Sequence, residues 1–144
     1  MNKTTFLSLA FLVLISCERE ESVNTITMIP DGTYKGTFQR ELVWSASRTA
    51  NIELIFTSNQ WSGSSDIEKY PAFCHGTYSI NKDTIIFVNQ CFWTAEFDWS
   101  LMLAGKYVLK PSGNTIEFSR DYRSSTSDTF IDRFRIENSN INVK

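Results

Sequence analysis

Residues 74–91 read CHGTYSINKDTIIFVNQC, in which apolar and polar residues alternate on both sides of a polar turn at 81–84. Side chains along a β-strand point to opposite faces in turn, so this pattern predicts two strands joined as an antiparallel hairpin. With the loop at 81–84, apolar residues oppose each other in the pairs Ile80 with Ile85 and Tyr78 with Phe87. A slip of one residue would turn a whole strand over, so the pattern specifies this register.

The same register places the two cysteines at the ends of the stretch, Cys74 and Cys91, opposite each other. Opposed Cα atoms lie about 4.5–5.5 Å apart, within the range of a disulfide, and closing this loop would contribute about 3 kcal/mol to stability. His75 is the next residue and should point to the opposite face, which argues against a metal site made by all three side chains. We expect a disulfide; free thiols come second, and a metal or catalytic site third.

Apolar and polar residues alternate with a period of two along most of the chain, which predicts an all-β fold. Short polar turns separate about eight alternating runs, near 32–42, 48–57, 60–66, 74–80, 84–91, 99–110, 114–122 and 128–136. Short loops between successive strands favour an antiparallel meander, because parallel pairs need long crossovers. Eight such strands can close into an up-and-down barrel, which removes the exposed sheet edges, and an open sandwich is the alternative.

Two further hairpins have self-consistent registers. Turns at 57–60 and 111–114 would oppose apolar residues in the pairs Phe56 with Trp61, Leu109 with Ile116, and Tyr107 with Phe118. The registers and the alternation put seven aromatic residues on one face, namely Tyr34, Phe38, Phe56, Tyr78, Phe87, Tyr107 and Phe118. These rings either line a cavity for an apolar or planar ligand or fill the barrel.

The N-terminus has the features of a bacterial lipoprotein signal peptide. One cation, Lys3, precedes an uncharged apolar run that is too short to span a membrane, and the run ends in Leu14-Ile15-Ser16-Cys17. This ending resembles the lipobox, which implies removal of residues 1–16, a diacylglyceryl group on the Cys17 sulfur and a further acyl chain on its amino group. More than one chain is what stable anchoring needs. A plain secretory signal with an incidental cysteine is the alternative.

Cleavage there predicts two remaining parts. Residues 17–30 would be the lipidated cysteine and a flexible, polar tether, and residues 31–144 would be one barrel domain. The lipid attaches the protein to a membrane, so we expect it in the bacterial cell envelope. The outer membrane is the favoured location, on its periplasmic face or at the cell surface.

Several stretches resemble the lipocalin-like bacterial lipoproteins: DGTYKGTF at 31–38, CHGTYSI at 74–80 and DWSLMLAGKY at 98–107. Lipocalins carry Gly-x-Trp on the first strand, with a basic residue of the last strand packed on the Trp. Here Gly32-Thr33-Tyr34 takes the place of that motif, and Arg133 or Arg135 is the candidate for the basic partner. The resemblance implies a barrel closed by this contact and, by default, binding of a small hydrophobic ligand.

Composition and motifs make other functions less favoured. The chain has 14 basic and 16 acidic residues, with no basic cluster that would indicate nucleic-acid binding. It has one histidine and no Gly-x-Ser-x-Gly motif, so we expect no enzyme, no metal site and no cofactor. Asp132 alternates with apolar residues, so it either points inward to a tyrosine or an arginine, or the face assignment there is inverted.

Two functions remain. The first is a lipid-anchored envelope protein that holds a small hydrophobic ligand among the seven rings. The second is an accessory or inhibitor lipoprotein with a solid core, whose loops bind another envelope protein of unknown identity. Trp44, Trp93 and Trp99 lie in or beside predicted loops, and they would favour the second function if they were exposed together.

The lipobox predicts the outcome of one substitution. Cys17→Ala removes the sulfur that carries the lipid, so the protein should leave the membrane fraction when cells are lysed and fractionated. A Ser16→Ala variant keeps the cysteine and should stay membrane-bound. Retention of Cys17→Ala in the membrane fraction would contradict the lipobox.

Overall fold

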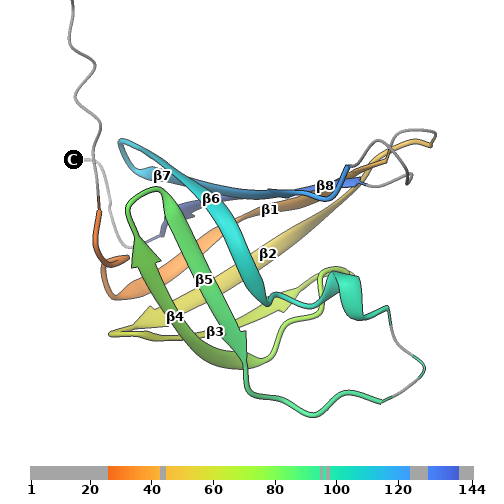
Figure 1. Cartoon of the computed structure of the whole chain (residues 1–144), viewed down its shortest axis with the longest axis horizontal. Helices are drawn as coiled ribbons and strands as arrows, with labels where there is room; N and C mark the ends of the chain where they lie inside the picture. The colour runs from red at the N-terminus through yellow and green to blue at the C-terminus, as the bar shows by residue number, and fades with distance from the viewer. Residues whose placement is uncertain (1–25, 43–44, 95, 97, 124–129, 140–144) are drawn as a thin grey trace, which may run out of the picture.

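The computed structural model describes residues 26–42, 45–94, 96, 98–123 and 130–139. Within these ranges, eight antiparallel strands close into one barrel in chain order (Figure 1). The strands are β1 Gly32–Leu42, β2 Arg48–Thr57, β3 Gln60–Ser65, β4 His75–Asn81, β5 Thr84–Asn89, β6 Gly105–Ser112, β7 Thr115–Asp121 and β8 Phe130–Asn138. The predicted up-and-down barrel is confirmed, and the open sandwich is wrong.

Helical structure is limited, in the part of the chain that the structure describes, to one 3₁₀ turn, η1, at Trp99–Leu101. None of the helical structure among the described residues is long and apolar enough to cross a membrane. The predicted strand at 99–110 is therefore too long, because β6 begins only at Gly105. The reason is local: Asp98 caps η1 by accepting from the backbone N–H of Ser100 at 3.0 Å, which turns the chain away from an extended path.

The hairpins test the predicted registers. The pairs Tyr78↔Phe87 and Phe56↔Trp61 are observed, so the registers of β4–β5 and β2–β3 are confirmed. The β6–β7 register is wrong by two residues, because Leu109 lies opposite Phe118 and the turn is at 113–114. Gly113 has φ +58°, which fits the first central position of a type II′ turn, a turn that matches strand twist. A shift of two keeps every side chain on its predicted face.

Pairing of β1 with β8 closes the barrel, and it runs from Tyr34↔Asn138 to Leu42↔Phe130. The two backbones approach closely at Gly36. A Cβ atom there would overlap the carbonyl oxygen of Arg135 and lie 2.8 Å from the Cα of Ile136, both on β8. Only glycine allows the first and last strands to meet at this distance.

The interior of the barrel is filled by aromatic rings. All seven residues of the predicted inner face are buried, the most exposed being Tyr78 at 5%. Ring centroids lie 4.6 Å apart for Phe118 and Phe134, 4.7 Å for Phe38 and Phe134, and 5.2 Å for Phe87 and Phe118. These distances are those of packed aromatic pairs.

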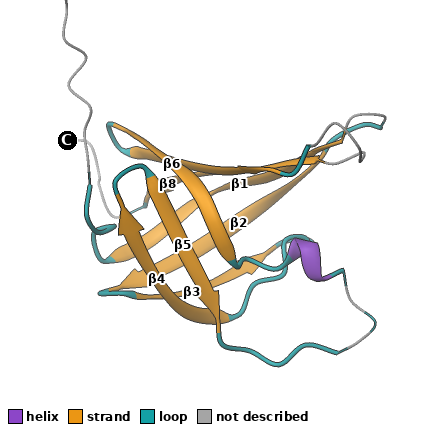
Figure 2. Cartoon of the chain, viewed as in Figure 1, coloured by secondary structure: helices purple, strands orange, loops and turns teal. Residues whose placement is uncertain are grey.

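The two ends of the barrel differ (Figure 2). At one end, which we call the turn end, the strands are joined by the tight turns 58–59, 82–83 and 113–114. At the other, the loop end, the described connections include the longer segments 66–74, 90–94 and 98–104. The alternation of side chains along the strands does not reveal this difference. The turn end has short turns, whereas the loop end has connections whose length and sequence can vary.

The segment before β1 covers the turn end. Ile29 is fully buried, and its backbone N–H donates to the hydroxyl of Tyr78 at 3.2 Å. The hydroxyl of Tyr34 donates to the carbonyl oxygen of Pro30 at 2.9 Å. The predicted flexible tether over 17–30 is thus wrong for residues 26–30, which pack on the barrel because Ile29 supplies an apolar plug. Residues 1–25, including Cys17, lie outside the described residues.

The close approach of β1 and β8 predicts a large effect of a single methyl group. Gly36→Ala should lower the free energy of unfolding by about 1–3 kcal/mol, because the two backbones must separate. Urea unfolding followed by tryptophan fluorescence measures the loss. Thr37→Ala, at the next position on β1, is the control and should change stability by about 0.5 kcal/mol or less. If Gly36→Ala is as stable as Thr37→Ala, the backbones of β1 and β8 do not approach each other closely at this position.

Candidate functional site

A buried ion pair lies inside the barrel toward the loop end. Arg40 on β1 and Asp132 on β8 are 5% and 2% exposed. The Nε of Arg40 donates to Oδ1 of Asp132 at 2.7 Å, and its Nη2 donates to Oδ2 at 2.8 Å, a bidentate pair. Burial raises the pKa of Asp132, and the hydrogen bonds from Arg40 act in the opposite direction. The inward position of Asp132 and an arginine as its partner are both confirmed.

The loop that contains η1 caps this pair. Nη1 of Arg40 donates to the hydroxyl of Ser100 at 2.9 Å, and Nη2 donates to the Ser100 carbonyl oxygen at 2.9 Å. The Asp98 carboxylate lies 3.5 Å from Nη1. The ring of Phe130 stacks 3.6 Å from the guanidinium carbon. Each nitrogen of Arg40 therefore has a partner within the chain, and the residue positions the loop rather than offering a free donor to a ligand.

A second guanidinium, that of Arg120, lies between two tyrosine rings. Its central carbon is 4.6 Å from the ring centre of Tyr107 and 4.1 Å from that of Tyr122. Its Nη1 donates to the carbonyl oxygen of Ala104 at 2.6 Å, whereas its buried Nε has no hydrogen-bond partner among the described residues. Burial raises the pKa of Tyr107 to about 12, so this phenol stays protonated at neutral pH. The arrangement is a cation–π stack that supports the inner wall.

The two long loops are joined to each other over the loop end. The N–H of Ala72 donates to the carbonyl oxygen of Leu101 at 3.0 Å, and the N–H of Leu103 donates back to Ala72 at 3.3 Å. Tyr70 and Phe73 reach inward from the same segment, with centroids 5.1 Å from Phe38 and 6.2 Å from Phe134, respectively. The chain itself therefore covers the interior at this end.

Exposed apolar side chains remain at the loop end. Phe92 is fully exposed, Trp99 is 55% exposed and Leu42 is 44% exposed. Trp93 is half-buried and donates to the side-chain oxygen of Asn89 at 3.2 Å. Trp44 lies outside the described residues. Of the predicted loop tryptophans, Trp99 is the one that the structure places in solvent.

The seven rings predicted to bind a ligand lie together inside the barrel, where they pack largely on each other. Tyr34 also borders an apolar hollow of about 190 Å³ at the turn end. Ile26, Pro30 and Ile116 line the same hollow. A small apolar group could enter there without displacing the core.

The predicted closure of the barrel by Arg133 or Arg135 on Tyr34 is wrong. Tyr34 is inside the barrel, whereas Arg133 alternates to the outer face of β8 and pairs with Glu117 at 2.8 Å and Glu41 at 3.2 Å. Arg135 is exposed on the same outer face. The residue that closes the barrel from within is Arg40. It shares the alternation of Tyr34 and Phe38, and this signal could have identified it from the sequence.

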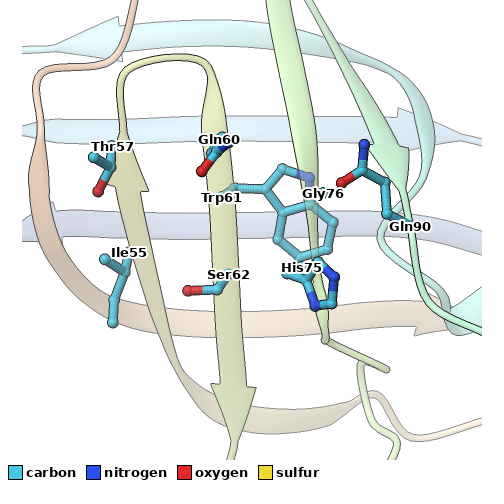
Figure 3. A pocket seen from close by; sticks show the side chains of 8 residues that line it. All are labelled: Ile55, Thr57, Gln60, Trp61, Ser62, His75, Gly76 and Gln90. Atoms are coloured by element: carbon cyan, nitrogen blue, oxygen red, sulfur yellow. The ribbon is translucent and has the colours of Figure 1, made fainter.

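The Cys74–Cys91 disulfide is present, as predicted. The predicted position of His75 is wrong: its Nδ1 lies 3.4 Å from the sulfur of Cys74 and 3.3 Å from that of Cys91. The ladder of β4 and β5 ends at Gly76↔Asn89, so both cysteines lie beyond the strands and the rule of alternating faces does not apply to them. His75 lines an outer hollow of about 290 Å³ together with Ser62 and Gln90. Figure 3 shows these three side chains around it.

Comparison of the chain with known protein families, with curated proteins and with solved structures found no match. The geometry of the candidate site is therefore what indicates its function.

The buried ion pair predicts strongly coupled substitutions. Asp132→Ala leaves the Arg40 guanidinium buried without its main partner and should lower the free energy of unfolding by about 3–5 kcal/mol. The double variant Arg40→Leu/Asp132→Ala removes both charges and should cost less than the single substitutions Arg40→Leu and Asp132→Ala combined. Urea unfolding measures each value.

The control for this experiment is Glu53→Ala, which breaks an exposed ion pair with Lys35 and should leave stability nearly unchanged. Additive effects of the Arg40 and Asp132 substitutions would contradict a coupled pair.

Proposed function

We propose that this chain is a lipid-anchored protein of the bacterial cell envelope that binds another envelope protein through the loop end of its barrel. The observation that supports this function best is the filling of the interior. The rings of the inner face pack on one another, and the chain covers the turn end with Ile29 and the loop end with Tyr70 and Phe73. A binding surface would then lie on the outside.

The exposed residues suggest which outer surface it is. Phe92 and Trp99 present large aromatic side chains at the loop end, and aromatic residues are enriched at the centres of protein interfaces. Each connection of the loop end that the structure describes is also longer than a tight turn, so its sequence can vary without changing the barrel.

The anchor would hold the loop end away from the membrane. The chain enters the barrel at the turn end, where Ile26 packs on the core. Only residues 18–25 separate the proposed lipid on Cys17 from Ile26, a stretch that spans about 30 Å at most when extended. The loop end is one strand length farther, since the 11 residues of β1 cover about 36 Å. It would therefore face a partner rather than the bilayer.

A second candidate function is the binding of a small hydrophobic ligand, as the resemblance to lipocalin-like lipoproteins implies. The closed eight-stranded barrel is compatible with that family. The apolar hollow that Ile26, Tyr34 and Ile116 line is the observation that favours this function. It lies at the turn end and holds about 190 Å³, so a ligand there would be small.

Site-specific photo-crosslinking in intact cells tests the first function. A photoreactive residue at Phe92 or Trp99 should produce one discrete crosslinked protein, the same from both positions. Val108, which is apolar, 47% exposed and in the barrel wall, is the matched control and should give no such product. Equal crosslinking from all three positions, or none, would exclude the loop end as the binding surface.

Native mass spectrometry of the purified protein separates the two functions. The first predicts the mass of the processed, lipidated chain with nothing else bound, whereas a co-purified small molecule that is lost in Ile116→Asp would support the second.

A further inference from the structure

The disulfide and the histidine beside it form a compact set of metal-ligating atoms on the barrel surface. We propose that Cys74, His75 and Cys91 are a redox-controlled metal site. As a disulfide, the two sulfurs hold the end of the β4–β5 hairpin; once reduced, they bind one thiophilic divalent ion such as Zn²⁺ together with His75. The three ligand atoms lie within 4.8 Å of one another.

The position of the imidazole fits tetrahedral coordination. Zinc binds sulfur at about 2.3 Å and imidazole nitrogen at about 2.0–2.1 Å, so tetrahedral ligands stand about 3.5 Å apart for S···N and about 3.8 Å for S···S. The Nδ1 of His75 is already 3.4 Å and 3.3 Å from the sulfurs of Cys74 and Cys91. The nitrogen is therefore placed for a metal that both sulfurs share.

Only the two sulfurs would have to move. On reduction they must separate from a bonded distance of about 2 Å to about 3.8 Å. Their Cα atoms are 6.4 Å apart, which leaves room for this change by rotation about the Cα–Cβ bonds. No shift of the backbone is needed.

The backbone around the site is held by bonds that do not involve the disulfide. The N–H of Gly63 donates to the carbonyl oxygen of Cys74 at 3.2 Å, and the N–H of Gln90 donates to that of His75 at 3.0 Å. The N–H of Cys91 donates to the side-chain oxygen of Asn89 at 2.9 Å. These contacts should keep the three ligands together after reduction, so the site is preorganised.

The site is open to its ion and to a reductant. His75 is exposed and both cysteines are half-buried. Figure 3 shows the imidazole of His75 on the outer surface of β4, at the side of the open hollow. A water molecule can therefore supply the fourth ligand of a tetrahedral ion.

The chemistry balances with a dithiol as reductant. One thiolate of the reductant attacks a sulfur of the bridge, and its second thiol then completes the exchange. The bridge gains two electrons and two protons and becomes two thiols, while the reductant becomes a disulfide. Binding of Zn²⁺ releases both thiol protons, so two thiolates, a neutral imidazole and the ion form a site of zero net charge. Thiolate ligands favour Zn²⁺ over Mg²⁺ or Ca²⁺.

Zinc binding by the full chain in detergent tests the proposal. The chain carries Cys17→Ser, so that Cys74 and Cys91 are its only cysteines. Competition with a chromophoric chelator should show one zinc ion per chain after reduction with a phosphine, and none in the disulfide form. His75→Ala should weaken zinc binding about tenfold or more, as loss of a ligand does at least what loss of an outer partner does.

Two variants are the controls. Gln90→Ala lies beside the site without supplying a ligand and should bind zinc as the parent does. Cys74→Ser/Cys91→Ser should bind none. Zinc binding unaffected by His75→Ala would overturn the three-ligand site, as would a reduced chain that binds no more zinc than the double serine variant. Loss of the near-ultraviolet circular dichroism spectrum on reduction would also overturn it, because the site requires the hairpin to keep its backbone.

Discussion

The pairing of β1 with β8 is the constraint on which the rest of this structure depends. It joins the first and last of the described strands, which otherwise pair with the strands next to them in the sequence, and it turns a meander into a closed barrel without free edges. Inside the barrel, the bidentate pair of Arg40 and Asp132 reinforces this junction of β1 and β8. Outside, Arg133 links Glu41 to Glu117 across three strands. Gly36 lets the two backbones approach closely enough to pair.

Closure of the barrel also decides where function can lie. Rings from all sides meet in the interior and contact one another, so the space that a wider barrel would leave for a ligand is occupied by Phe87, Phe118 and Phe134. Arg40 then uses its remaining hydrogen-bond capacity to hold Ser100 and the loop around it. The buried charge that holds the junction of β1 and β8 thus also orders the surface that we propose as the binding face.

The stretch from Cys74 to Cys91 contains both a disulfide and a histidine beside its sulfurs, although the rule of alternating faces would place the histidine on the opposite face. Within the strands, alternation holds and the register is the predicted one. At the strand ends alternation no longer holds, and His75 lies close to both sulfurs. A structural disulfide and a latent set of metal ligands can therefore occupy the same hairpin end.

Local pattern was enough to predict the strands other than the start of β6, the barrel, the hairpin registers around Tyr78 and Phe56, and the disulfide, because alternation and tight turns involve residues close in the chain. The same pattern predicted Asp132 as an inward residue and could have identified Arg40. It could not predict that these two residues pair, since they are 92 positions apart and only closure of the barrel brings them together. Nor could it predict the plug at Ile29 or the contact of His75 with the sulfurs. Those depend on where the chain leaves the strands, and packing in three dimensions decides this.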